Sequence, residues 1–390
     1  MVTMRKIFSA NFILLIILSF CSCSSQVLDL SFVGDIMAHD VNFKMKDYSV
    51  MYENVAQHLL VDDITFGNFE SPVDNSLPYS TYPNFNVHSE YVEAAINAGI
   101  DVFSLANNHS NDQGSNGALA TMDSMLKLRH KYQNESKRNI YFSGLRKTTF
   151  DGLDVQIINK NNLRIAFVCV TEILNIYNAS RHKVQFYYYN QDYRKEFSEK
   201  VSLIKMKTNC DLLILSVHIA EPEYVREISD LRKEYFRQLT ECGADIIWAH
   251  HPHVVLPWEK YITKSGRESL IMYSMGNFIS GQRYRMNYKK PDSPREYTGD
   301  SYILKVAVMR KWRSNDFVYK LNPIPITTKI DYSTGDVKLY EFTESFINDQ
   351  EPKLKNYYKK RFNLMKEQLA DLLPWEKLDN SDDALILEAN

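Results

Sequence analysis

An apolar run that ends in three histidines decides the fold: Ile246-Ile247-Trp248-Ala249-His250-His251-Pro252-His253-Val254-Val255. The residues up to Ala249 have the composition of a buried strand, and Pro252 stiffens the turn that follows. Histidines held at the end of a strand in this way are a common means of presenting imidazoles to a metal ion. Histidine-rich turns also occur in packed or solvent-exposed loops. The interpretation therefore depends on the other strands of the chain.

Four other predicted strands also stop on polar residues of the metal-ligand type. The strands cover residues 27–33, 64–66, 101–105 and 211–217, and the polar residues beyond them include Asp35, Asn68, Glu70, Asn108, His109 and His218. Each cluster has an ordinary explanation when taken singly, such as a tight turn, a helix N-cap or a satisfied polar group. In α/β folds, however, binding sites lie beyond the carboxyl ends of strands. The five strand ends together predict one shared site.

The segments between the strands indicate an α/β fold. Helical patterns at residues 89–96, 117–130, 197–207 and 227–240 alternate with the strands, as in folds that flank sheets with helices. Beyond Phe278 the chain changes character: two alternating strands predict a hairpin, and a charged amphipathic helix follows over 351–373. We therefore expect one main domain over 27–345, followed by a C-terminal helix and tail over 346–390.

The first residues have the pattern of a lipoprotein-type signal peptide over 1–22. Arg5 and Lys6 precede an apolar run that is too short for a comfortable membrane span, and small residues and cysteines follow it. Cys23 is the better lipid acceptor, because a serine precedes it whereas bulky Phe20 precedes Cys21. A lipid on Cys23 would tether an exported protein to the membrane of the cell envelope. A secreted or periplasmic protein without lipid is the alternative.

Composition and cysteine content exclude several functional classes. The chain has 390 residues, is 44% hydrophobic and carries a formal net charge of -2, so it offers no general basic surface for nucleic acid. The cysteines that follow Cys23, namely Cys169, Cys210 and Cys242, form no CxxC pair. We expect them to pack as small hydrophobic residues rather than to form a disulfide framework or a thiol catalyst.

The predicted ligands are carboxylate, amide and imidazole groups, which suit Mn, Zn, Fe or Mg. Two such ions bridged by one carboxylate activate water and bind both the attacking and the leaving oxygen of a displacement reaction. Glu70 is the best-placed residue for the bridging carboxylate. His109 follows Asn108 directly, so one residue is placed to bind metal while the next reaches the substrate as an acid or as an electrostatic stabiliser. Asp112 is close enough in sequence to orient His109.

Several motifs, taken in order, resemble those of the poly-γ-glutamate capsule-biosynthesis family (CapA-like), which is similar to calcineurin-like metallophosphoesterases. The resemblance covers residues 28–281 and implies a four-layer sandwich, with two mixed β-sheets flanked by helices and a dimetal-type site at the strand ends. The motifs are Gly34-Asp35-Ile36-Met37, Gly67-Asn68-Phe69-Glu70-Ser71-Pro72, Ala106-Asn107-Asn108-His109, Ser216-Val217-His218, His250-His251-Pro252-His253-Val254 and Tyr273-Ser274-Met275-Gly276-Asn277-Phe278.

The resemblance implies a role for each matching residue. Asp35 would bind the first metal ion with His253, and Glu70 or Asn68 would occupy the bridging place. The second ion would be bound by Asn108, His218 and His251, and His109 would be the catalytic histidine. His250 is not expected to be a ligand. For substrate binding we expect Asn277 and the basic residues that follow the last motif, above all Arg283 and Arg285, although such residues also occur in plain solvated loops.

The chain departs from the phosphoesterase pattern at two ligand positions and from the capsule family at one motif. Met37 stands where phosphoesterases have a histidine, and Asn68 stands where they have a bridging aspartate. The sequence His218-Ile219-Ala220-Glu221-Pro222-Glu223-Tyr224 replaces the family's shorter His-Trp-Gly form. Fewer anionic ligands weaken the binding of divalent ions. Two ions, one ion and none all stay open.

Three functions follow from these observations. The first is a cell-envelope protein of the capsule-biosynthesis class, with a metal-dependent hydrolase site for a polyanionic or γ-glutamyl polymer and with polymer synthesis or export proteins as partners. The second is a non-catalytic factor that keeps the fold and binds or exports polymer, which the residues Met37 and Asn68 favour. The third is an extracytoplasmic metallophosphoesterase. The sequence does not decide whether the protein is an enzyme.

Overall fold

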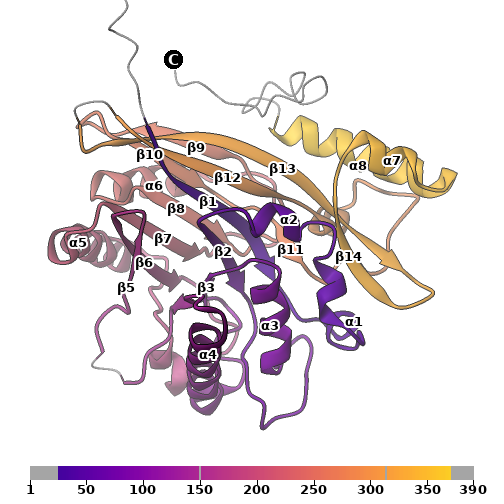
Figure 1. Cartoon of the computed structure of the whole chain (residues 1–390), viewed down its shortest axis with the longest axis horizontal. Helices are drawn as coiled ribbons and strands as arrows, with labels where there is room; N and C mark the ends of the chain where they lie inside the picture. Colours follow the sequence, from indigo (N-terminus) through magenta and orange to yellow (C-terminus); the bar gives the residue numbers. More distant parts are fainter. Residues whose placement is uncertain (1–24, 149–150, 312–313, 370–390) are drawn as a thin grey trace, which may run out of the picture.

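Two mixed β-sheets packed face to face and flanked by helices form the protein, as the family resemblance implied (Figure 1). The structure is a computed structural model, which describes residues 25–148, 151–311 and 314–369. The predicted signal peptide, Cys23 and the tail beyond residue 369 lie outside the described residues. Among the helices of the described part, none has the length and apolar character needed to cross a membrane.

The larger sheet has eight strands and holds both the first motifs and the C-terminal hairpin. Its order is β14-β13-β12-β1-β2-β3-β4, with β11 also paired to β1. Strands β1 to β4 and β11 run parallel, and β12 to β14 are antiparallel to their neighbours. The bounds are β1 (Ser25–Ile36), β2 (Ile64–Phe69), β3 (Val102–Ser104), β4 (Tyr141–Ser143), β11 (Asn277–Ile279), β12 (Asp300–Arg310), β13 (Phe317–Asp331) and β14 (Asp336–Glu341).

The smaller sheet has six strands in the order β5-β6-β7-β8-β10-β9. Its four central strands are parallel, and an antiparallel strand closes each edge. The bounds are β5 (Gln156–Lys160), β6 (Leu163–Thr171), β7 (Leu212–His218), β8 (Ile246–His250), β9 (Trp258–Ile262) and β10 (Glu268–Met272). The opening stretch of the sequence therefore forms an inner strand, which explains its unbroken apolar run.

The helices cover the outer faces of the sheets. Helices α3 and α4 lie beside the parallel strands of the larger sheet, α5 and α6 lie beside the smaller sheet, and α7 and α8 lie beside the C-terminal strands (Figure 1). The bounds are α1 (Asp40–Phe43), α2 (Ala56–Leu59), α3 (Ser89–Asn97), α4 (Gly114–Ser136), α5 (Gln191–Thr208), α6 (Asp230–Glu241), α7 (Glu344–Asn348) and α8 (Pro352–Leu369), with 3-10 turns η1 (Tyr48–Met51), η2 (Ala179–Lys183) and η3 (Pro294–Gly299).

Aromatic side chains fill the space between the two sheets. Phe32 stacks on Phe66 with ring centroids 4.8 Å apart, and Phe66 meets Phe167 of the other sheet at 5.4 Å. Trp248 of β8 donates a hydrogen bond from its indole nitrogen to the carbonyl oxygen of Val33 in β1, at 3.1 Å. This bond satisfies the one polar atom of a fully buried indole and fixes the two sheets to each other just below the strand ends.

Parallel strands bring the polar clusters to one edge of the sandwich. In the larger sheet Asp35 is in register with both Asn68 and Asn277, and in the smaller sheet His218 is in register with His250. Close packing of β1 against the segment before β11 requires glycine at position 34, because a Cβ atom there would lie 1.9 Å from the carbonyl oxygen of Gly276. The predicted convergence of strand ends is present in the fold.

Some elements differ from the expectations. The final motif, which begins at Tyr273, directly follows β10 of the smaller sheet, and its last two residues begin β11 of the larger sheet. Strands β9 and β14 and helix α7 were not predicted. The C-terminal helix is α8, and it packs its buried aromatic side chains on the main core rather than standing apart.

Candidate metal centre

Asp35 lies at the centre of a buried hydrogen-bond network at the end of β1. Its Oδ1 accepts a hydrogen bond from Asn68 at 2.8 Å and lies 3.3 Å from Nδ1 of His250. Its Oδ2 lies 3.1 Å from Nδ1 of His253, which is also 3.0 Å from Oδ1 of Asn277. With two oxygen acceptors beside it, Nδ1 of His253 carries the proton, and the lone pair is left on Nε2.

The Glu70 side chain lies between site residues from the larger sheet and site residues from the smaller sheet. Its Oε2 accepts a hydrogen bond from Asn68 at 3.2 Å. Its Oε1 lies 3.8 Å from Nε2 of His253 and 4.0 Å from Nε2 of His218. This central position is the one that a bridging carboxylate needs, and Asp35, Glu70 and His253 form a buried group whose ligand atoms all lie within 4.8 Å of one another.

His218 and His251 form the second half of the site. Nε2 of His218 lies 3.2 Å from Nδ1 of His251. Two imidazole nitrogens bound to one tetrahedral zinc ion at about 2.0–2.1 Å are separated by a similar distance, because the ligands of one ion are close neighbours. The resemblance assigns both histidines to the second ion, and the positions of the two rings are compatible with that assignment.

Burial keeps these imidazoles neutral. It lowers the pKa of His218 well below its usual value and, with the nearby His253, lowers that of His251 to about 3. Burial also raises the pKa of Glu70 well above its usual value, and the charge of Asp35 adds to this effect. For Asp35 burial acts in the same direction, but hydrogen bonds from the neighbouring histidines outweigh it and leave the pKa well below the usual range. Neutral imidazoles beside an ionised carboxylate are the forms that bind a cation.

Among the predicted site residues, four side chains each leave a buried oxygen atom without a hydrogen-bond partner in the described part of the chain, and one of them is Asp112 through its Oδ1. The other three are Oδ1 of Asn68, Oε1 of Glu70 and Oδ1 of Asn108. A buried polar atom without a partner costs about 1–3 kcal/mol. Such atoms are retained where a ligand satisfies them, so the donor set fits a divalent cation held by oxygen and imidazole ligands.

The backbone of the histidine turn has an unusual conformation. His251 has a φ of 102° and His253 has a φ of 57°, and Tyr224 on the facing loop has a φ of 64°. Positive φ values are unfavourable for residues with a Cβ atom and concentrate at functional sites. The turn aims both imidazoles at the site at the expense of local strain.

His109 and Asp112 form the expected pair beside this network. Nδ1 of His109 lies 2.6 Å from Oδ2 of Asp112, and both side chains are buried. Asp112 also accepts the backbone N–H of Phe85, whose ring lies edge-on to the imidazole at 4.5 Å. The amide nitrogen of Asn175 lies 3.2 Å from Nε2 of His109. Asp112 therefore fixes the tautomer with the proton on Nδ1, and Nε2 faces the amide of Asn175.

Asn108 lies in the same turn, but the described contacts do not bring it against the other predicted ligands. Its amide nitrogen donates to Oδ1 of Asn175 at 3.3 Å, while its own Oδ1 has no hydrogen-bond partner among the described residues. The neighbouring Asn107 donates to the carbonyl oxygen of Phe69 at 2.8 Å and so connects this turn to the segment that carries Glu70. A ligand role for Asn108 stays a prediction.

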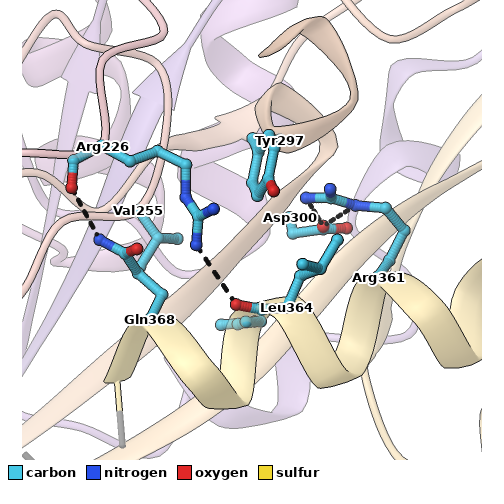
Figure 2. A pocket seen from close by; sticks show the side chains of 8 residues that line it. Arg226, Val255, Tyr297, Asp300, Arg361, Leu364 and Gln368 are labelled. Atoms are coloured by element: carbon cyan, nitrogen blue, oxygen red, sulfur yellow. Dashed lines mark hydrogen bonds and ion pairs between the residues drawn. The ribbon is translucent and has the colours of Figure 1, made fainter. Parts of the chain in front are cut away.

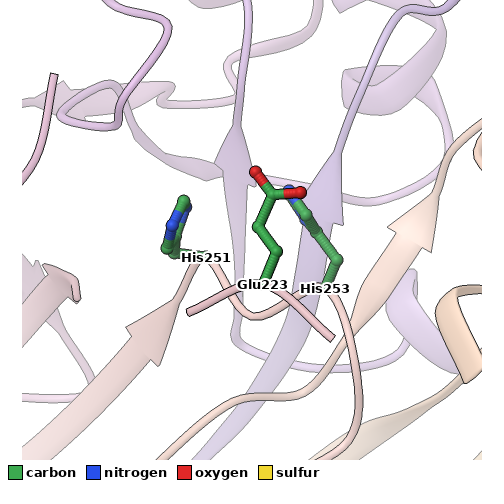
Figure 3. A group of neighbouring side chains, drawn as sticks. All are labelled: Glu223, His251 and His253. Carbon is green, nitrogen blue, oxygen red and sulfur yellow. The ribbon is translucent and has the colours of Figure 1, made fainter. Parts of the chain in front are cut away.

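Two residues that were set aside or overlooked belong to the site. His250 lies beneath Asp35, and its Nε2 is 3.1 Å from the hydroxyl of Ser216. Its position indicates that it orients the carboxylate, a role distinct from that of a ligand. Glu223 is exposed on the loop after β7, and its carboxylate groups with His251 and His253 (Figure 3). Only the tertiary fold brings Glu223 to the two histidines.

The predicted substrate-binding residues have different positions. Asn277 is buried and orients His253, and its amide nitrogen is bonded to Gln282 and Thr298. Arg283 is 1% exposed and forms an ion pair with Asp300, so a direct substrate contact is incompatible with its position. Arg285 is exposed, and its role stays a prediction.

The architecture and the buried carboxylate–histidine cluster define an α/β sandwich with a candidate metal centre at its strand ends. The family model described as "Bacterial capsule synthesis protein PGA_cap" matches residues 29–282, which include every predicted ligand. The chain therefore belongs to this bacterial capsule synthesis family.

Two relatives carry names that agree with this membership. The chain is 29% identical over 271 residues to the capsule biosynthesis protein CapA of Bacillus anthracis, with 66% of this chain and 61% of that protein covered. It is 24% identical over 340 residues to the PGA biosynthesis protein CapA of Bacillus subtilis (strain 168), with 80% and 84% covered. The chain thus spans less than two thirds of the length of the first relative.

Solved structures superpose only loosely on the chain. The superposition on a hypothetical protein from Thermus thermophilus covers 76% of this chain and 98% of that protein, at a TM-score of 0.42 and 12% identity. The superposition on the calcineurin-like phosphoesterase YfkN from Bacillus subtilis covers 89% of this chain and 100% of that protein, at a TM-score of 0.39 and 12% identity. Neither superposition is close enough to carry a functional conclusion.

Proposed function

We propose that the protein is a metal-dependent hydrolase of the cell envelope that acts on an anionic polymer of the γ-glutamyl type during capsule synthesis. The observation that carries the proposal is the grouping of Asp35, Glu70 and His253 around buried oxygen atoms that lack partners among the described residues. The name of the Bacillus subtilis relative, a PGA biosynthesis protein, supports this polymer class. Proteins that synthesise or export the polymer are the expected partners.

The residues divide into two sets that would hold one or two divalent ions. Asp35 and His253 would hold the first ion, His218 and His251 would hold the second, and Glu70 lies between them. When bound, a divalent ion supplies Lewis-acid activation of water and of the scissile carbonyl. The lowered pKa values of His218, His251 and Asp35 favour neutral imidazoles and an ionised carboxylate, which are the protonation states that such binding requires.

His109 is placed to move a proton during hydrolysis. Hydrolysis of an amide adds the hydroxyl of water to the acyl carbon and a proton to the departing nitrogen. Asp112 stabilises the positively charged imidazolium through Nδ1, so Nε2 of His109 is the atom that would deliver the proton. This division of roles follows from the geometry of the pair.

A basic side chain near the opening of the site supports an anionic substrate. Arg295 is exposed, and its Nε donates to the carbonyl oxygen of Gln282 at 2.6 Å. Gln282 in turn contacts Asn277 of the centre and the hydroxyl of Tyr224. An exposed cation at the edge of the centre would attract the carboxylates of a polymer chain.

Replacing His109 with asparagine is expected to reduce turnover by about 100-fold or more while metal content stays unchanged, because general acid catalysis contributes about 10²–10⁴-fold. Release of product from γ-glutamyl polymer and from phosphoester substrates is the measurement. His130→Asn on the exposed face of α4 is the matched control. Wild-type turnover in the His109 variant would remove its catalytic role.

A second candidate is a polymer-binding or export factor without catalysis, which the neutral Asn68 and the apolar Met37 favour. A third is an extracytoplasmic phosphoesterase. The two substrate classes in the same assay separate these functions. Binding of polymer without hydrolysis of either substrate would favour the second, and hydrolysis of phosphoesters alone would favour the third.

Export and membrane attachment through Cys23 are also part of the proposal, and they rest on the sequence of the first 25 residues. Substitution of Cys23 by alanine is expected to move the protein from the membrane fraction to the soluble fraction, since a lipid anchor requires the thiol. Cell fractionation with Cys21→Ala as the matched control is the measurement. Release by the Cys21 variant alone would assign the lipid to the other cysteine.

A further inference from the structure

The loop between β7 and α6, residues 219–229, reaches over the candidate centre. It carries Glu223, whose side chain is exposed to solvent and directed toward the two histidines of the turn after β8 (Figure 3). One ligand atom each from Glu223, His251 and His253 lies within 4.8 Å of the others. A carboxylate facing two imidazoles at this spacing is a donor set that suits a divalent transition metal.

The rest of the centre is short of negative charge. Asp35 and Glu70 are the carboxylates of the buried group, whereas Asn68 and Met37 occupy positions where an anion or an imidazole was expected. Affinity for a divalent cation rises with the number of charged ligands. Glu223 offers the additional carboxylate, from a loop outside the strand-end motifs.

The loop is attached to the histidine turn from the inside. The backbone N–H of Tyr224 donates to the carbonyl oxygen of Pro252 at 2.9 Å. The hydroxyl of Tyr224 accepts a hydrogen bond from Gln282 at 3.4 Å. These contacts fix the residue next to Glu223 and hold it in a left-handed conformation, with a φ of 64°.

Helix α8 holds the same loop from the outside (Figure 2). The guanidinium of Arg226 lies 4.0 Å from the ring centroid of Tyr297, and that of Arg361 from α8 lies at the same distance from this ring. Arg226 also donates to the carbonyl oxygen of Leu364 at 3.3 Å, and its own carbonyl accepts from Gln368 at 3.0 Å. The C-terminal helix, which lies beyond the family match at 29–282, therefore holds the loop in place.

We propose that Glu223 is a metal ligand of the centre and that α8 holds its loop in the binding position through Arg226 and Gln368. The inference rests on the proposed function, because it requires that the centre bind metal. It assigns to the C-terminal helix a role in the site, in addition to its packing on the core.

Titration of the full chain with Mn²⁺ by calorimetry tests both parts. Glu223→Gln is expected to weaken Mn²⁺ binding at least about tenfold, and Gln368→Ala about threefold, because the second change loosens the loop without removing a ligand. Glu227→Gln on the same loop and Asn363→Ala on the same helix are matched controls, since both residues are exposed. The controls are expected to bind as the wild type does.

The outcomes separate this inference from the proposed function. If Asp35→Asn loses Mn²⁺ while Glu223→Gln binds it like the wild type, the centre exists and Glu223 is not a ligand. If Glu223→Gln is weaker but Gln368→Ala matches Asn363→Ala, the role of α8 is overturned. A wild-type protein that binds no Mn²⁺ contradicts the proposed function itself. Urea denaturation of each variant excludes loss of folding as the cause.

Discussion

Asp35→Asn is expected to reduce affinity for a divalent metal ion by about 100-fold or more, beyond the loss seen when a residue only orients a ligand. The substitution keeps the shape of the side chain and removes its charge. It also replaces one of the two oxygen acceptors, of which Oδ1 faces His250 and Oδ2 faces His253. Because the amide can still take part in the network with Asn68, the fold should persist while the ion is lost.

Metal content after dialysis, determined by inductively coupled plasma mass spectrometry, measures this effect. Asp123→Asn is the matched control, because Asp123 lies on the exposed face of α4, where it pairs with Lys127. The control should retain the wild-type metal content. Equal metal content in the Asp35 variant would mean that any bound ion lies elsewhere.

Asp300→Asn is expected to lower the free energy of unfolding by about 3–5 kcal/mol, the cost of leaving buried charges without their counter-charge. Asp300 lies 2.5 Å from a guanidinium nitrogen of Arg283 and 2.6 Å from one of Arg361. All three side chains are buried, so water cannot replace the lost carboxylate. The pairs also connect three separate segments: the turn after β11, the start of β12 and helix α8.

The effect of Asp300→Asn depends on pH with a definite sign. Burial raises the pKa of Asp300, but the charges of Arg283 and Arg361 outweigh burial and hold it below its usual value of 3.8. Its stabilisation is therefore complete above pH 3.8 and is lost as the pH falls through the lowered folded-state value. Urea denaturation at neutral and acid pH should show the difference between wild type and variant shrinking toward low pH.

The matched control is Asp349→Asn, since this exposed residue at the end of α7 forms no ion pair in the described residues. A change within about 0.5 kcal/mol is expected there. If Asp300→Asn behaved like this control, the buried triad would have no stabilising role. The position of Arg283 would then need a different explanation.

The sequence anticipated that several strand ends meet at one place because parallel strands constrain their positions. Asp35, Glu70 and His218 each follow a strand of strong apolar pattern, and such strands place their carboxyl ends at one edge of a sheet. The histidine turn after β8 follows the same rule. Local pattern alone was enough to anticipate that these side chains meet.

The residues that the sequence missed are those whose positions depend on distant contacts. Glu223 reaches the histidines because Tyr224 bonds to Pro252 and Arg226 packs beside α8, which lies more than a hundred residues further along the chain. Arg283 was predicted to bind substrate because it lies in a basic loop, yet its partners Asp300 and Arg361 bury it. No local pattern reveals such pairings.

The most direct test of the metal centre is an anomalous difference map from a crystal of the full chain grown with Mn²⁺. We predict a peak in contact with Asp35, Glu70 and His253, and a second peak beside His251 if two ions bind. A map without a peak among these side chains, at a Mn²⁺ concentration that saturates binding in solution, would contradict the assignment.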